Sequence, residues 1–298
     1  MTLHSTNALR RRAVLALPAL LSLPARAQSK PVVVATFSIL GDLVAQIAGE
    51  TVDLRVLIGP DQEAHDFQPR PSDAEKLRGA ALVVRNGLGL EPWIERMMRG
   101  ARSVAPLVTT TDRMNPLLFN GIADPHAWME VQRTRTYALN IAGGLYEILP
   151  SAAEREARAG LSALMARLAR LDDDIRKELA VIPDKRRVLV APHAALRYFS
   201  EAYAVNVVTP PTGSAEALPS PLDIATLVRR MKEERIIALF RSPIGNDTLI
   251  RTLAMEAGVP VKGTIYTDAL STPDGPAGTY ESMMRHNVRL MVSAMTET

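Results

Sequence analysis

Three histidines and one aspartate stand where side chains from distant parts of the chain could form one metal site. The chain has only five histidines, and three of them lie near the ends of apolar runs, in short segments bounded by proline, glycine or aspartate. An aspartate holds a fourth such position. Neutral imidazole nitrogens with one carboxylate suit a borderline-soft divalent ion, above all Zn²⁺. The four candidate ligands are His65, His126, His193 and Asp268.

Each candidate also has a purely structural explanation. His65 suits a solvated, proline-rich loop, and Asp268 suits a turn or a helix N-cap. His126 and His193 suit packed histidines, the first of them satisfied by Asp124. A contact with Asp124 would equally fix the tautomer of a metal-binding imidazole. Because the candidates lie 61, 67 and 75 residues apart, only the whole fold can bring them together.

The first 27 residues have the composition of an export signal. Arginines at 10–12 precede an apolar run at 13–23, and residues 25–27 (Ala-Arg-Ala) offer a small-residue cleavage site. The apolar run is too short to span a membrane, and its paired arginines leave the Sec and the twin-arginine routes both open. We therefore expect residues 1–27 to be a signal peptide and the mature protein to be periplasmic.

The composition argues against several classes of protein. Removing the leader removes four of the 35 basic residues, which leaves 31 against 32 acidic ones, and no basic patch argues for nucleic acid. Without cysteine there is no disulfide, thiolate ligand or catalytic thiol. The acylated cysteine of a bacterial lipid anchor is missing as well. We expect a monomer that is free in the periplasm.

Strand and helix patterns indicate an α/β protein with two groups of strands. Apolar segments typical of buried strands alternate with segments of helical pattern, as in parallel α/β units. Between the groups, residues 152–182 carry apolar and charged residues at helical spacing. Such a helix would span about 45 Å, either as a long helix on one core or as a spine joining two lobes. The expected strands are residues 31–37, 53–58, 80–86 and 104–109, then 188–191, 205–208, 236–240 and 261–266.

Five short segments follow one another along the chain. They are residues 61–73 around His65, 86–93 (Asn-Gly-Leu-Gly-Leu-Glu-Pro-Trp), 124–128 (Asp-Pro-His-Ala-Trp), 193–199 around His193, and 267–270 (Thr-Asp-Ala-Leu). In this order they resemble motifs of the ZnuA/TroA family of zinc and manganese receptors of ABC importers. Any single segment is a weak signal, whereas five in the same order are specific.

The resemblance implies two α/β lobes, each with a four-stranded parallel sheet, joined by one long helix with the metal between the lobes. The lobes would be residues 28–150 and 184–298, and the helix residues 151–183. In the family, histidine as the third ligand goes with zinc and glutamate with manganese, so His193 indicates Zn²⁺ as the transported ligand. The expected partner is an ABC permease in the inner membrane. Many relatives have a histidine-rich loop before the second ligand, but residues 109–124 contain no histidine, so we also expect delivery by a periplasmic metallochaperone.

Two other functions stay open, although we expect a binding protein rather than an enzyme. The same fold could select manganese or iron. A zinc hydrolase would need an open metal position and a base such as Glu63 or Glu130. The sequence has no H-E-x-x-H motif and no serine nucleophile elbow. Glu130 stands where the family often has Asp-Pro, which makes it a candidate for contact with the site.

The other histidines and a group of methionines are expected outside the site. His4 belongs to the leader, and His286 lies on an amphipathic C-terminal helix, where we expect surface or packing. The methionines on that helix recur at helical spacing without cysteine, which favours core over a soft-metal site. They are Met283, Met284, Met291 and Met295.

Overall fold

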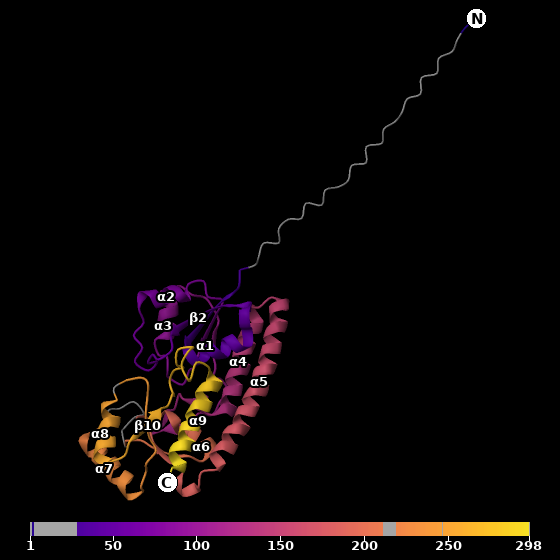
Figure 1. The fold of residues 1–298 in the computed structure, drawn as a ribbon. Coiled ribbons are helices and arrows are strands. Elements are labelled where there is room, and N and C mark those ends of the chain that lie inside the picture. Colours follow the sequence, from indigo (N-terminus) through magenta and orange to yellow (C-terminus); the bar gives the residue numbers. More distant parts are fainter. Residues whose placement is uncertain (1, 3–28, 211–218, 246, 298) are drawn as a thin grey trace.

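The protein forms two α/β lobes arranged end to end, with one long helix along their side (Figure 1). The computed structural model describes residues 2, 29–210, 219–245 and 247–297. Almost all of the expected signal peptide, residues 1–27, lies outside the described residues, so it stays a prediction. No helix in the described ranges is long and apolar enough to cross a membrane.

The amino-terminal lobe is built on a parallel sheet with the strand order β2-β1-β3-β4. Val33 and Val34 in the central strand β1 are fully buried, as expected of a strand covered on both faces. The elements of this lobe are β1 (Val32–Phe37), α1 (Ser38–Ala48), η1 (Gly49–Thr51), β2 (Asp53–Ile58), α2 (Pro71–Leu77), β3 (Leu82–Arg85), α3 (Ile94–Gly100), β4 (Leu107–Thr109), β5 (Leu118–Phe119), β6 (Ile122–Ala123), η2 (Ala127–Met129) and α4 (Val131–Ile148).

The carboxy-terminal lobe has a second parallel sheet, with the order β10-β9-β7-β8. Two four-stranded parallel sheets confirm the predicted fold class. The elements of this part are α5 (Ser151–Ala180), η3 (Asp184–Arg186), β7 (Val188–Val190), η4 (Ala194–Leu196), α6 (Arg197–Tyr203), β8 (Asn206–Val208), α7 (Pro221–Glu233), β9 (Leu239–Arg241), α8 (Thr248–Ala257), β10 (Val261–Thr264) and α9 (Tyr280–Thr296).

Helix α5 contacts both lobes, as Figure 1 shows. It packs against α1 and α4 of the first lobe and against α6 and α9 of the second. Its buried residues, among them Leu164, Leu168 and Leu171, recur at three and four along the chain. The long helix is therefore the spine of the predicted fold. The boundaries of the lobes at residues 150 and 184 remain a prediction.

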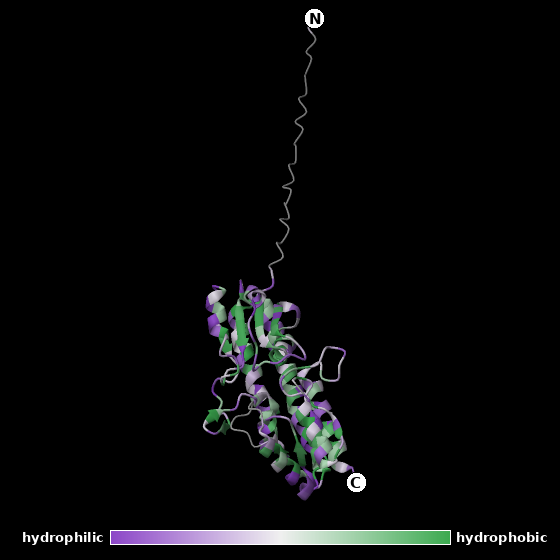
Figure 2. Ribbon diagram, turned by 90° about the vertical axis from the view of Figure 1, so that its left-hand side faces the viewer, coloured by the Kyte–Doolittle hydropathy of each residue, from purple (hydrophilic) through white to green (hydrophobic). Residues whose placement is uncertain are grey.

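One apolar core runs through most of the molecule. It extends from Val33 on β1 through Ile141 on α4 and Leu168 on α5 to Met291 on α9. A smaller cluster lies under α7 and α8. In Figure 2 the hydrophobic strands of the first lobe lie inside, and hydrophilic residues colour the outer helices. All four methionines of α9 are buried, which confirms the prediction that they belong to the core.

A short hairpin, β5–β6, was not predicted from the sequence. Its strands are only two residues long and pair antiparallel. Between them Asn120 and Gly121 have φ angles of 50° and 81°, the conformation of a type I′ turn, for which Asn-Gly is the preferred sequence. The dipeptide was therefore a usable signal. The hairpin leads directly into the loop that carries His126.

Candidate metal centre

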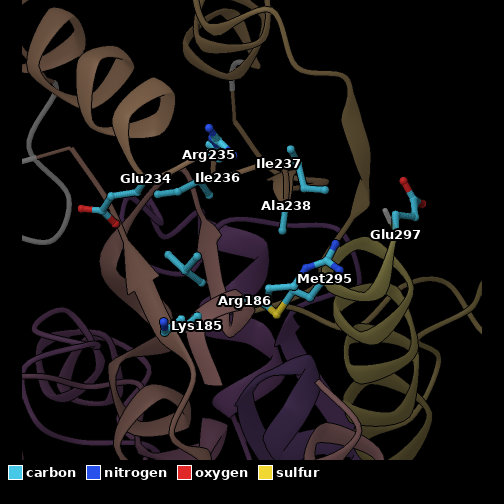
Figure 3. Close-up of a pocket in the computed structure, with 10 residues that line it drawn as sticks. Lys185, Arg186, Glu234, Arg235, Ile236, Ile237, Ala238, Met295 and Glu297 are labelled. Carbon is cyan, nitrogen blue, oxygen red and sulfur yellow. The ribbon is translucent and has the colours of Figure 1, made fainter. Parts of the chain in front are cut away.

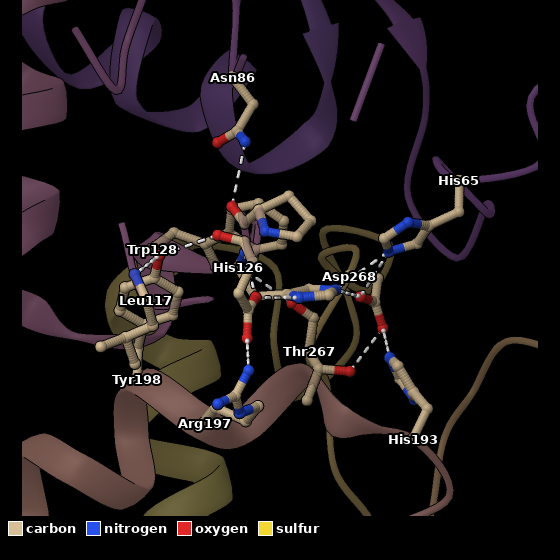
Figure 4. Close-up of polar contacts among 12 residues, drawn as sticks. His65, Asn86, Leu117, His126, Trp128, His193, Arg197, Tyr198, Thr267 and Asp268 are labelled. Carbon is tan, nitrogen blue, oxygen red and sulfur yellow. Dashed lines mark hydrogen bonds and ion pairs between the residues drawn. The ribbon is translucent and has the colours of Figure 1, made fainter. Parts of the chain in front are cut away.

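The two lobes bring three of the predicted site residues into one tight group (Figure 4). The Nε2 atom of His65 lies 3.0 Å from Nε2 of His126. The Oδ1 atom of Asp268 lies 3.2 Å from Nε2 of His126 and 3.6 Å from Nε2 of His65. Donor atoms of these three residues all lie within 4.8 Å of one another, a spacing that can hold a metal ion.

His193 joins this group through the second carboxylate oxygen. Its Nε2 atom lies 3.0 Å from Oδ2 of Asp268, and its ring centroid lies 5.9 Å from that of His126. The tight three-residue group does not include His193. All four predicted residues therefore meet around Asp268, with His193 on its far side.

Each candidate ligand lies in a loop, and each lobe contributes two of them. His65 lies between β2 and α2, and His126 between the hairpin and η2. His193 follows β7, and Asp268 follows β10. The loops after β2, β7 and β10 leave the carboxyl ends of parallel strands, where α/β sheets place their ligand sites. The site therefore lies between the lobes.

The site is buried unevenly. The side chain of His126 is 0% exposed and that of Asp268 is 3% exposed, whereas His65 and His193 are 15% and 24% exposed. The two buried residues thus form the floor of the site. The two more exposed histidines, one from each lobe, stand towards solvent.

Charge and burial shift the pKa values of these groups. Burial alone would raise the pKa of Asp268, but the charge of His193 and hydrogen bonds with His126 and His193 hold that pKa well below its usual range. Burial lowers the pKa of His126, but bonds to Asp124 and Asp268 outweigh it and raise the pKa to about 9. Burial lowers the pKa of His193 as well, but the charge of Asp268 and the hydrogen bond with it together outweigh burial, so that pKa is raised. The site therefore stabilises a positive charge.

Contacts with neighbouring residues fix the orientation of His126. Its Nδ1–H donates to Oδ1 of Asp124 at 2.8 Å, which confirms the predicted contact. The same oxygen accepts the backbone N–H of His126 at 3.0 Å. Asn86 donates to the carbonyl of Pro125 at 3.0 Å. A carboxylate on Nδ1 directs Nε2 towards the site, where it can bind a metal ion once its own proton has left.

The three donors of the tight group have the spacing of neighbouring ligands around a tetrahedral divalent ion. Oδ1 of Asp268 is buried, and although it lies 3.2 Å from Nε2 of His126, it makes no hydrogen bond of normal geometry with the described residues, as expected of an oxygen aimed at a cation. A zinc ion with bonds of about 2.0–2.1 Å separates neighbouring donors by about 3.3 Å. The separations of 3.0, 3.2 and 3.6 Å in the tight group lie on both sides of that value.

Two carboxylates considered as rival ligands or bases make other contacts. The carboxylate of Glu130 accepts a hydrogen bond from Nε of Arg133 at 2.6 Å, so its side chain is directed to the first turn of α4. Glu63 accepts the backbone N–H of His65 at 2.9 Å, so it shapes the His65 loop. His286 bonds the carbonyl of Thr264 at 2.9 Å, which confirms its predicted packing role.

Several residues around the site were missed by the sequence analysis. Thr267 donates to Oδ2 of Asp268 at 2.6 Å, and Trp128 donates to the carbonyl of Thr267 at 2.7 Å. Arg197 and Tyr198 reach the Asp124 segment from the other lobe. Thr267, Trp128 and Tyr198 belonged to recognised motifs, but only the fold reveals what they contact.

A separate cavity of about 440 Å³ lies where strands β7 and β9 of the second sheet begin (Figure 3). Ile236, Ala238 and Met295 form apolar walls, and Lys185 and Arg235 are among its charged residues. None of the four candidate ligands lines it. It is therefore distinct from the histidine cluster.

Comparison with known proteins places the chain among metal receptors. The family described as zinc-uptake complex component A, periplasmic, matches residues 33–294. The manganese-binding lipoprotein MntA of Halalkalibacterium halodurans is 33% identical, over 89% of this chain and 88% of that protein. The iron-binding protein YfeA of Yersinia pestis is 31% identical, over 92% of each chain. The periplasmic zinc-binding protein TroA from Treponema pallidum has a TM-score of 0.84 at 27% identity, over 90% of this chain and 100% of that one.

The expected location of the protein needs correction. The lack of cysteine led us to expect a protein free in the periplasm without a lipid anchor. The relative MntA, which this chain resembles over almost its whole length, is named a lipoprotein. This likeness points to association with the membrane. The absence of one residue type was too narrow a basis for that expectation.

Proposed function

Because this chain belongs to the ZnuA/TroA family of periplasmic metal-binding subunits of ABC transporters, we propose that it captures Zn²⁺ between its lobes and delivers it to an ABC permease. The observation that carries the proposal is the convergence of His65, His126 and Asp268 within 4.8 Å, with His193 on the second oxygen of Asp268. Members of the family are transport proteins rather than enzymes.

The chemistry of the donors supports zinc. Three imidazole nitrogens and one carboxylate oxygen match closed tetrahedral coordination of Zn²⁺. Manganese prefers more oxygen ligands and a higher coordination number. His193 brings a nitrogen where an oxygen donor would suit manganese better, and its Nε2 already lies 3.0 Å from Asp268.

Release follows from the division of the ligands between the lobes. His65 and His126 come from one lobe, and His193 and Asp268 from the other. A small separation of the lobes would split the donor set, and a permease that favours the separated form would lower the affinity for the ion. We propose a monomer with lobes at residues 28–150 and 184–298, a linking helix at 151–183, and a metallochaperone as a second partner.

Manganese or iron transport is the second candidate function. It is favoured by the names of two relatives, the manganese-binding MntA and the iron-binding YfeA. Both relatives match this chain over most of their length, so the family alone does not fix the metal. The donor set of this chain is what favours zinc over the other two ions.

Competition between metals tests the proposal. Trp128 lies beside His126, with ring centroids 5.3 Å apart, so its fluorescence reports on the site. We expect Zn²⁺ to bind one per chain and to displace Mn²⁺ and Fe²⁺ when all are supplied in equal amounts under anaerobic conditions. If the protein kept Mn²⁺ or Fe²⁺ in the presence of equimolar Zn²⁺, zinc would be the wrong metal and the retained ion would be the transported one.

A further inference from the structure

We propose that Arg197 is a positioning residue that joins the His193 segment to the Asp124–His126 pair and so sets how tightly the site holds its metal. The proposal rests on the proposed function, because it deepens the role of the same site. Arg197 is not a candidate ligand. It belongs to the first turn of α6, four residues after His193.

Arg197 approaches the oxygen of Asp124 that His126 does not use. Its Nη1 lies 3.8 Å from Oδ2 of Asp124, while Oδ1 of Asp124 holds Nδ1 of His126 at 2.8 Å. The guanidinium of Arg197 thus contacts the carboxylate of Asp124, which in turn holds the imidazole of His126 in the site.

Burial makes this contact consequential. Nη1 of Arg197 and Oδ2 of Asp124 are both buried, and neither has a hydrogen-bond partner among the described residues. Each is thus the other's neutralising charge in a poorly solvated place. Without the guanidinium, Oδ2 would be a buried carboxylate oxygen with no polar contact of its own among the described residues, and the carboxylate would be expected to turn or draw in water.

Other contacts hold the guanidinium itself in place. Nη2 of Arg197 donates to the carbonyl of Leu118 at 3.1 Å, and its guanidinium carbon lies 4.9 Å from the centre of the Phe119 ring. Both residues belong to the hairpin that leads into the His126 loop. Arg197 therefore ties the second lobe to the hairpin as well as to Asp124.

The next residue strengthens the same connection. The hydroxyl of Tyr198 donates to the carbonyl of Asp124 at 2.8 Å and accepts the backbone N–H of Leu117 at 3.0 Å. One short segment thus carries a candidate ligand from the second lobe, His193, and two contacts that hold a candidate ligand of the first. Moving His193 away from His126 has to strain or break these contacts.

Two effects of Arg197 oppose each other, and their signs can be separated. As a cation near the site it repels an arriving dication, so removing only its charge would strengthen metal binding. As a positioning group it keeps Asp124 aligned on His126, so removing it would weaken binding. Loss of a residue that orients a ligand typically costs about ten- to hundredfold in metal affinity. We infer that the positioning effect is the larger.

The test compares three variants of the full chain, Arg197→Met, Arg197→Lys and Arg187→Met. Arg187 is the matched control, because it also bonds a backbone carbonyl and a carboxylate, Ile182 at 2.9 Å and Asp184 at 3.3 Å. The first measurement is Zn²⁺ affinity by competition with a chromophoric chelator. The second is the His126 Nδ1–H signal of ¹⁵N-histidine-labelled, metal-free protein, which reports alignment on Asp124 without any metal.

We expect Arg197→Met to weaken Zn²⁺ binding about ten- to hundredfold and to shift and broaden the Nδ1–H signal. Arg197→Lys keeps the positive charge but loses the planar guanidinium with its several N–H donors. It should therefore recover part of the Zn²⁺ affinity and part of the Nδ1–H signal. Unchanged or tighter binding by Arg197→Met, an unchanged signal, or an equal loss in Arg187→Met would overturn the proposal. Wild-type protein that binds no Zn²⁺ would instead refute the proposed function, and the metal-free signal would still decide the role of Arg197.

Discussion

His126 lies between two buried carboxylates, and this arrangement governs how the site responds to protons and to metal. Its Nδ1–H donates to Asp124, and its Nε2 lies 3.2 Å from Oδ1 of Asp268. With the pKa of His126 raised to about 9 despite its burial, the metal-free imidazole carries a second proton at neutral pH. That proton occupies the side on which a metal ion would bind, so metal binding has to displace it.

Replacing His126 tests the ligand set at its most buried member. We expect His126→Ala to weaken Zn²⁺ binding by more than the roughly hundredfold cost of losing an orienting residue, because a donor itself is lost. Isothermal titration calorimetry measures the affinity and the stoichiometry. His286→Ala is the control, since His286 bonds Thr264 away from the cluster. Tight one-to-one binding by the His126 variant would show that the ligand set is wrong.

The carboxylate behind His126 is expected to matter less than the ligand itself. Asp124→Asn keeps the shape and one acceptor oxygen but loses the negative charge that supports the imidazole. We expect Zn²⁺ affinity to fall about tenfold to hundredfold, measured by chelator competition. Asp184→Asn serves as the control, because Asp184 is exposed and pairs with Arg187. Equal affinities for the two variants would contradict a role of Asp124 in orienting His126.

The raised pKa of His126 predicts how metal affinity depends on pH. Only an imidazole with an unprotonated Nε2 binds metal, so affinity must fall as the pH falls. Because the pKa is about 9 rather than 6.5, affinity should still rise between pH 7 and pH 9, by up to about tenfold per unit for each displaced proton. Chelator competition across pH 5 to 9 measures this slope. Equal affinity at pH 5 and pH 7.5 would contradict the prediction.

Residue types and motifs were enough to select the four residues that meet, but not the residues that hold them. Each of the four has a structural explanation when taken alone, and they could be chosen because each stands in a family motif and the motifs follow in the same order. These residues are His65, His126, His193 and Asp268. Arg197 gave no such signal, because an arginine at the start of a helix is usually a solvated residue. Its contact with Asp124 depends on how two lobes are placed, which local sequence does not encode.

At the scale of elements, a close approach between two helices depends on one glycine of the spine. A Cβ on Gly160 of α5 would lie 2.3 Å from the carbonyl oxygen of Ile47 on α1, and a backbone atom cannot yield cheaply. We expect Gly160→Ala to lower the free energy of unfolding by about 1–3 kcal/mol, measured by urea denaturation.

An exposed glycine in the neighbouring helix provides the control for this experiment. A Cβ on Gly143 of α4 would meet nothing within 4 Å. Gly143→Ala should therefore raise the free energy of unfolding by about 0.4–1 kcal/mol, as expected of a helical site that accepts alanine. A Gly160 variant as stable as the Gly143 variant would show that the helices are not in close contact there.

Long or strongly apolar elements were predictable, and very short ones were not. The strand at 53–58 was predicted with its observed bounds, and the helix at 152–182 differs from α5 by one residue at its start and two at its end. The strand expected at 236–240 begins only at Leu239, since the backbone N–H of Ile236 still bonds Met231 at the end of α7. Two-residue strands leave no periodicity to detect.

At the scale of the whole molecule, hydrogen bonds connect the lobes near the site. Oγ of Ser38, at the start of α1, accepts the backbone N–H of Leu270 at 3.0 Å. Oδ2 of Asp42 accepts the N–H of Tyr280, at the start of α9, at 2.8 Å. The loop of Asp268 and the start of α9 are thus held by α1. These contacts place the second lobe without any metal, so metal adds to an existing arrangement.

Metal should therefore stabilise both lobes together. A ligand that binds only the folded chain adds about 2.7 kcal/mol at a free concentration of one hundred times its Kd, which corresponds to a rise in Tm of about 5 °C for a protein of this size. We expect this rise on adding Zn²⁺ to metal-free protein and its reversal by a chelator, measured by differential scanning calorimetry. Since donors come from both lobes, a single transition should move as a whole. His126→Ala is the control and should show no comparable rise in Tm at the same Zn²⁺ concentration. If the protein unfolded in two transitions and only one of them moved, the metal would be bound by one lobe. That result would contradict a site shared between the lobes.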